Sequence, residues 1–298
     1  MKFRLSVLCA AALLSASAAF AQSEAFPFVR IDRNPRTAAM AGAGSASVRD
    51  IAYASFRNAA VIPFYDGTVD AGLNWQRWAP ESMSANHFNL SAGAKLGDAF
   101  GFSVGGAYQA GEACDSFRPY EMVVNAGGGY RITDRLGFGV NFRYAGTTVA
   151  KGTDYAGFAA DVQVIYRALP GLYVSAGVVS AGGQVVSSSG DKFSLPASFL
   201  VAASYRHGFG TDHALEVNLD QNTFFSGNVT AAVGAEYGFR DLLFVRAGFH
   251  YGTDGAVLPT FATVGVGVQY AGFRLDFAYL TASEFLGNTL SVGLGYGF

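Results

Sequence analysis

The last nine residues of the chain alternate between large apolar and small side chains. Leu290, Val292, Leu294, Tyr296 and Phe298 are interleaved with one serine and three glycines. Side chains along a β-strand point alternately to its two faces, so this spacing predicts a strand with one apolar face and one small or polar face.

The same alternation recurs from residue 64 to the end of the chain, in about fourteen runs. The clearest further runs are 88–96, 136–144, 158–167, 264–270 and 273–279. Short turn sequences separate some of them: Gly97-Asp98, Thr133-Asp134, Pro170-Gly171, Arg240-Asp241 and Ala271-Gly272. Longer polar segments separate the others: 76–86, 109–118, 146–154, 181–196, 221–228, 252–259 and 280–288. Short turns that alternate with long loops are typical of outer-membrane barrels.

Composition argues against an ordinary soluble protein. Hydrophobic residues make up 51% of the chain and charged residues only 14%, against about 25% charged in typical soluble domains. Beyond the N-terminal region no apolar run approaches the roughly 20 residues that a spanning helix needs. A closed barrel is the other structure that satisfies every backbone polar group in lipid. We therefore predict an all-β fold, a transmembrane barrel of about 14 antiparallel strands over residues 64–298, with outer-membrane lipid as a partner.

The N-terminus predicts export from the cytoplasm. Lys2 and Arg4 precede an apolar run over 5–18, and Ala19-Phe20-Ala21 forms a small-residue cleavage site, so residues 1–21 are expected to be a signal peptide. The alternative, an uncleaved anchor helix, is disfavoured because the run is short. The expected location is the cell outer membrane, and the net charge of −2 argues against nucleic acid as a partner. Cys114 would be the single cysteine of the mature chain, with no assigned role.

The strands that run toward the short turns end in aromatic residues. These are Tyr130, Tyr166, Tyr205, Tyr237, Phe239, Tyr270, Tyr296 and Phe298. Aromatic residues at one level form a girdle at a membrane interface, so the short turns and both termini are expected to be periplasmic. The final strand also resembles the closing strand of bacterial outer-membrane barrels. That resemblance implies that Tyr296 and Phe298 are a recognition signal for the barrel-assembly machinery.

Residues 22–63, which we call the hatch, have no period of two. The stretch 37–60 is rich in Ala, Gly and Ser, which suits a compact segment packed inside the lumen, with a short helix near 48–56. The alternative is a disordered periplasmic tail. Against it, Met40, Ile51, Tyr53 and Phe56 give the segment side chains to bury.

Three runs of the hatch carry a family resemblance: residues 35–46, 50–54 and 58–60. They resemble the N-terminal signature of the PorV/PorQ family, which is related to the FadL-type long-chain fatty-acid transporters. The matching positions are Arg36, Met40, Gly42, Gly44, Asp50, Asn58, Ala59 and Ala60. Ala59 departs from the pattern, because the family usually has a proline there, and this puts direct transfer of a transport mechanism in doubt.

The resemblance implies a component of type IX-like protein secretion or surface attachment. Secreted cargo proteins or other secretion components would then be its partners. The alternative is a FadL-like transporter of hydrophobic small molecules, which would need an apolar pocket inside the barrel and a lateral opening in the wall. The polar, glycine-rich lumen face weighs against that alternative. A third hypothesis, an open diffusion pore, conflicts with a hatch packed into the lumen.

A set of polar side chains is expected to face the lumen. Its members are Glu121, Asn125, Asn141, Arg143, Asp161, Gln163, Arg167, Arg246, His250, Gln269, Arg274 and Asp276. Opposite charges are expected to pair across the barrel and with the hatch, because an unpaired charge there is costly. The alternative role for this set is a polar path or a ligand contact.

No motif predicts an enzyme, a cofactor or a metal site. Residues 101–105 match the G-x-S-x-G nucleophile pattern, but that motif needs a strand-to-helix turn, and here Ser103 lies in mid-strand and is expected to face the lumen. Gly42-Ala43-Gly44 follows no predicted strand, as a dinucleotide site would require. The histidines are scattered without metal-ligand spacing: His207 and His213 are expected in turns, and His87 has no assigned role.

Overall fold

The computed structural model describes most of the chain beyond its first 29 residues. The described residues are 30–78, 85–110, 120–150, 153–183, 185–186, 192–193, 195–253, 256, 258–281 and 288–298. The expected signal peptide, the start of the hatch and Cys114 lie outside them. No helix in the described part of the chain is long and apolar enough to cross a membrane.

Strands dominate the described chain. The hatch contains α2 (Pro35–Ala38) and α3 (Ala54–Arg57), and the 3₁₀ helix η3 (Ala59–Phe64) follows them. The first strands are β1 (Val69–Trp78), β2 (Ala85–Leu96), β3 (Phe100–Ala110), β4 (Tyr120–Arg131), β5 (Leu136–Ala150), β6 (Thr153–Leu169), β7 (Leu172–Gly182), β8 (Val185–Val186) and β9 (Lys192–Phe193). The others are β10 (Ser198–Phe209), β11 (His213–Phe224), β12 (Val229–Phe239), β13 (Leu243–Gly252), β14 (Phe261–Tyr270), β15 (Phe273–Leu280) and β16 (Thr289–Gly297).

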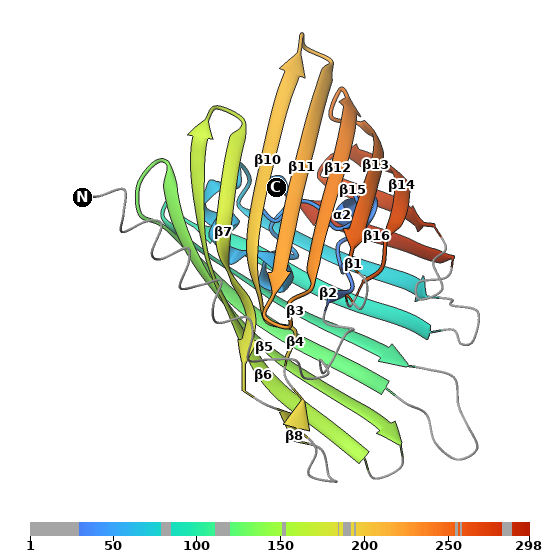
Figure 1. Cartoon of the computed structure of the whole chain (residues 1–298). Coiled ribbons are helices and arrows are strands. Elements are labelled where there is room, and N and C mark those ends of the chain that lie inside the picture. The colour runs from blue at the N-terminus through green and yellow to red at the C-terminus, as the bar shows by residue number, and fades with distance from the viewer. Residues whose placement is uncertain are drawn as a thin grey trace.

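Fourteen of these strands form one closed barrel (Figure 1), which confirms the predicted fold class. Each strand pairs antiparallel with the next, and the ring closes where β1 pairs with β16, from Asp70 opposite Gly297 to Arg77 opposite Leu290. The strands β8 and β9 form a separate two-stranded sheet in the connection between β7 and β10. Closure leaves no sheet edge with unpaired backbone groups.

The period of two sets the two faces of the barrel wall. In β3, Phe102 and Val104 are 40% and 48% exposed, whereas Ser103 between them is fully buried. The tyrosines that end the strands before the short turns also lie on the outer face and are exposed. The wall therefore presents apolar side chains outward and small or polar side chains inward, as an outer-membrane barrel does.

The two ends of the barrel differ in their connections. We call the end with the short connections 97–99, 132–135, 170–171, 210–212, 240–242 and 271–272 the turn end, and the opposite end the loop end. The expected long loop over 146–154 is wrong, because Thr147 and Thr148 pair with Tyr155 and Asp154 and extend the hairpin of β5 and β6. β-branched residues favour such pairing. The expected long loop over 221–228 is too long, because β11 continues to Phe224 and Gln221, Asn222 and Thr223 pair with β12. The remaining expected long loops lie partly outside the described residues.

The hatch lies inside the barrel, where Figure 1 shows its short helices enclosed by strands. The short helix expected near 48–56 is present only in part, since α3 begins at Ala54. The backbone N–H groups of Ile51 and Ala52 donate instead to the Asp70 carboxylate of β1, and this contact with the wall replaces helical hydrogen bonds. The limits 22–63 for the hatch stay a prediction.

Glycines of the inner wall make room for the hatch backbone. A Cβ atom on Gly139 of β5 would collide with the backbone of Ala60, and one on Gly248 of β13 would collide with the backbone of Met40. Gly93, Gly129 and Gly234 also face hatch backbone, whereas a Cβ atom on Gly101, Gly105, Gly265 or Gly293 would collide with a hatch side chain. Much of the glycine alternation therefore reflects close packing around the hatch.

Candidate functional site: the hatch and its lumenal cavity

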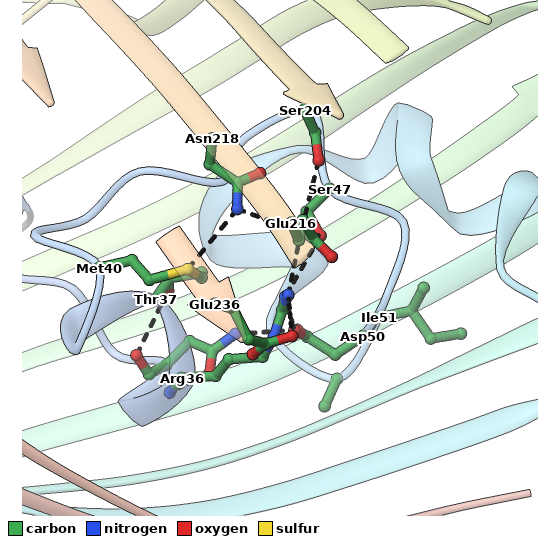
Figure 2. Close-up of polar contacts among 12 residues, drawn as sticks. Arg36, Thr37, Met40, Ser47, Asp50, Ile51, Ser204, Glu216, Asn218 and Glu236 are labelled. Atoms are coloured by element: carbon green, nitrogen blue, oxygen red, sulfur yellow. Dashed lines mark hydrogen bonds and ion pairs between the residues drawn. The ribbon is translucent and has the colours of Figure 1, made fainter. Parts of the chain in front are cut away.

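Arg36 of α2 anchors the hatch to the barrel wall. Its Nε donates to Glu236 Oε2 of β12 at 2.8 Å, and its Nη2 lies 2.9 Å from Glu216 Oε1 of β11. Figure 2 shows the guanidinium group between these two carboxylates. All three side chains are buried. A planar guanidinium suits such paired carboxylates better than an ammonium would.

Further bonds extend the Arg36 contact in both directions. On the hatch side, Nη1 of Arg36 donates to Ser47 Oγ at 3.2 Å and to Asp50 at 3.3 Å. On the wall side, Arg246 of β13 bridges Glu236 and Asp276 with two bonds of 2.6 Å. Burial alone would lower the pKa of Arg36, but Glu216 and Glu236 raise that pKa well above its ordinary value. Arg36 thus stays charged.

Two further wall carboxylates hold the hatch through its backbone. Asp220 of β11 accepts hydrogen bonds from the N–H groups of Gly44 and Ser45, at 3.0 and 3.1 Å. Asp70 of β1 accepts bonds from two hatch N–H groups and is also paired with Arg274 of β15. Bonds to charged acceptors are stronger than neutral ones, so these carboxylates fix hatch segments that form no regular structure.

A third set of polar contacts between wall and hatch lies beside the register shift between β6 and β7. Arg143 of β5 donates to Ser180 Oγ at 2.7 Å and to the Phe56 carbonyl at 3.2 Å, and it pairs with Asp161 at 3.3 Å. The register of β6 and β7 shifts beside Asp161, so Val179 and Ser180 are consecutive residues that are both buried. Ser180 has a positive φ of 55°, and its N–H donates to Asp161 at 2.6 Å.

Asn58 connects the end of the hatch to η3. Its Oδ1 accepts a bond from the Ala60 N–H at 2.9 Å, which caps η3, and its Nδ2 donates to the Ser45 carbonyl at 2.7 Å and to Ser175 of β7. Ala59 and Ala60 are fully buried against glycines of β4 and β5. The cap therefore orients the start of η3, where Ala59 is the residue after Asn58.

A cavity of about 160 Å³ lies on the loop-end side of the hatch. The hatch supplies its floor, which includes Arg33 and Arg57. Much of its wall is apolar and comes from Val179, Leu200, Phe224, Ala232, Leu258, Phe261 and Leu280. Leu258 lies in the connection between β13 and β14, and the other wall residues lie near the loop-end limits of their strands. The wall at this level also includes eight polar or charged residues, namely Gln76, Arg143, Asp161, Ser180, Asp220, Asn222, Thr230 and His250. The lumen is therefore partly polar here, as expected, and partly apolar, and its glycines contact the hatch below.

The structure brings together most of the predicted lumen-facing residues. Arg246 pairs with Asp276, and Arg143 pairs with Asp161. Asn141 donates weakly to Asp161 at 3.4 Å, and Arg274 pairs with Asp70. Gln163 is buried, whereas Arg167 lies apart from these groups near the turn end of β6.

The wall carboxylates that hold the hatch were absent from the predicted set. Glu216 and Asp220 alternate in β11 with Leu215 and Leu219, which are exposed on the outer face. The same period of two holds around Glu236 in β12. The alternation could therefore have identified these residues as lumen-facing, although it does not reveal that Arg36 is their partner.

The other candidate residues have structural surroundings. Ser103 accepts a bond from the Ser55 N–H and donates to the Ala52 carbonyl. His250 faces inward as expected, but His207 and His213 lie within β10 and β11 and not in turns. No cluster of potential metal ligands occurs among the described residues. The role of exposed Tyr296 and Phe298 in assembly stays a prediction.

Comparisons with known proteins give a fold but no family. No family model matches the sequence, and no curated protein matches it. Among solved structures, the toluene transporter TbuX of Ralstonia pickettii superposes with a TM-score of 0.64 at 16% identity, over 89% of this chain and 97% of that one. The monoaromatic hydrocarbon channel CymD gives a TM-score of 0.64 at 14% identity, with the same coverage.

A FadL homologue of Pseudomonas aeruginosa gives a TM-score of 0.59 at 11% identity, over 89% of this chain and 98% of that one. The structural neighbours are thus outer-membrane barrels of FadL type, and they share the fold of this chain. The resemblance to the PorV/PorQ family is not confirmed by these comparisons, and they give no support to a role in type IX secretion.

Proposed function

We propose that this protein lies in the outer membrane and passes hydrophobic small molecules through it, without catalysing a reaction. The observation that carries the proposal is the cavity above the hatch, whose wall includes Leu200, Phe224, Phe261 and Leu280. An apolar surface inside the barrel is one of the two features that the transporter hypothesis requires, and the other, a lateral opening in the wall, stays a prediction. Ligand sites are in general concave and mostly apolar, with a few polar groups.

The position of the cavity supports this proposal. It adjoins the loop end, which is the outer end if the short turns are periplasmic, and the hatch lies beneath it. A molecule that entered from outside would therefore meet the apolar wall before the charged network of Arg36. Structural neighbours whose names describe toluene transport and monoaromatic hydrocarbon channels point to the same ligand class.

Cavity filling tests the proposed function. Ala232 lines the cavity, whereas its neighbour Ala231 lies on the outer face of β12 and is exposed. In a deletion strain complemented with each variant, Ala232→Trp should abolish most of the uptake of radiolabelled toluene, because the indole occupies the ligand space. Ala231→Trp makes the same change on the lipid side and should leave uptake near the unsubstituted level. Equal uptake by the deletion strain and its parent would refute the proposal.

A further inference from the structure

The apolar wall of the cavity is flanked by two neutral polar side chains. Gln76 of β1 and His250 of β13 both line the cavity and are buried, with exposures of 2% and 6%. Phe261 and Leu280 lie on β14 and β15, between these two strands in the order of the barrel. The cavity therefore offers an apolar surface with a hydrogen-bonding group on each side.

Neither polar group is fully satisfied by the protein. The Gln76 carboxamide oxygen is buried and has no hydrogen-bond partner. His250 Nδ1 lies 2.9 Å from the Pro259 carbonyl oxygen. Because a carbonyl only accepts, Nδ1 carries the proton, and in the neutral ring Nε2 is left as an acceptor. A buried polar group without a partner is costly, so a ligand that pairs with these groups gains relative to one that does not.

The charged groups around the cavity already have partners. Arg57 pairs with Asp32 at 2.6 Å, and Arg143 pairs with Asp161. The Arg33 guanidinium lies 2.8 Å from His87 Nδ1. A charged ligand would have to displace one of these contacts, whereas a neutral hydroxyl both donates and accepts and so satisfies a carboxamide in either orientation.

We propose that the cavity selects neutral single-ring alcohols or phenols over hydrocarbons of the same shape. The ring lies against Phe261 and Leu280, and the hydroxyl pairs with Gln76 or His250. The volume of about 160 Å³ suits a ligand of one ring, since an apolar cavity of roughly 150 Å³ holds benzene. This inference rests on the proposed function, because it names the ligand class of the same cavity.

Phenol and toluene provide the test, because they differ only by a hydroxyl in place of a methyl group. Calorimetric titration of the purified full-length protein in detergent should show phenol binding about tenfold more tightly than toluene, and Gln76→Leu should remove most of that difference by weakening phenol alone. A second variant, His250→Phe, should also reduce the phenol preference. This second change keeps the proposal testable if Gln76→Leu fails to assemble.

Gln109→Leu is the matched control. Gln109 of β3 is also inward, buried and without a partner for its amide oxygen, but it does not line the cavity, so its loss should leave the phenol-to-toluene ratio unchanged. A ratio near one in the unsubstituted protein, or the same ratio in all variants, would overturn the inference while toluene binding still supported the proposed function. Failure of both ligands to bind would count against the inference and the proposed function together.

Discussion

The two sides of the hatch are held in the barrel by different interactions, close packing on one side and buried ion pairs on the other. On one side, η3 packs its backbone against glycines of β4 and β5, with no charged group between them. On the other side, Gly234 and Gly248 also contact Met40, but α2 is in addition joined to β11 and β12 through Arg36 and two buried carboxylates. The glycine side requires that the wall glycines carry no Cβ atom, whereas the charged side requires that every buried charge keeps its ion-pair partner. The first should fail when an atom is added, and the second when a partner is removed.

Loss of Arg36 is expected to have the largest effect on the charged side. Arg36→Ala leaves Glu216 buried without its cation and Glu236 with only Arg246, and breaking a buried pair typically costs about 3–5 kcal/mol. Denaturant titration of the protein in lipid vesicles would measure the free energy of unfolding. Protease digestion of the hatch would report whether it leaves the lumen.

Arg240→Ala is the control for this prediction. Arg240 pairs with Asp212 at 3.2 Å between two turns, where their side chains are 62% and 38% exposed. Exposed pairs of this kind contribute about 0–1 kcal/mol. If Arg36→Ala destabilised the protein no more than Arg240→Ala does, the hatch would not be held by charge.

The fold was accessible from the sequence because a period of two is a local signal. The alternation at the C-terminus and in runs such as 136–144 predicts strands, faces and a strand count near fourteen, and the structure closes fourteen strands into a barrel. The loop at 146–154 was not accessible in this way, because Thr147 and Thr148 are polar enough to suggest a loop although they pair in the hairpin.

The site was accessible only in part, because its partners lie far apart in the sequence. Periodicity can place Glu216 on the inner face, but its partner Arg36 lies 180 positions earlier in a segment without periodicity. The sequence alone does not reveal the role of Gly139 either, because a glycine suits both an open lumen and the close approach of the Ala60 backbone. The interpretation of a polar lumen therefore missed the apolar residues that share the cavity wall with the polar ones.

An added methyl group is the corresponding change on the glycine side. Gly139→Ala places a Cβ atom against the backbone of Ala60, which cannot move aside as a side chain would. Overpacking of this kind costs about 1–3 kcal/mol, so the denaturant midpoint should fall, though by less than for Arg36→Ala. Gly106→Ala in β3 is the matched control, because the nearest atom to its Cβ would lie 3.8 Å away, an ordinary contact. Similar denaturant midpoints for the two variants would show that the hatch can shift to accommodate the added methyl group.

The smallest effect is expected at Ser103, where the hatch meets a single neutral side chain. Ser103→Ala removes a bond of 3.0 Å to the Ala52 carbonyl and one of 3.2 Å from the Ser55 N–H. A neutral bond contributes about 1 kcal/mol, so the same titration should show a loss of about 2 kcal/mol for the two bonds. A loss of this size would be the contribution of neutral hydrogen bonds to a contact that glycines and ion pairs already position. A loss as large as that of Arg36→Ala would contradict the division of the hatch into a side held by shape and a side held by charge.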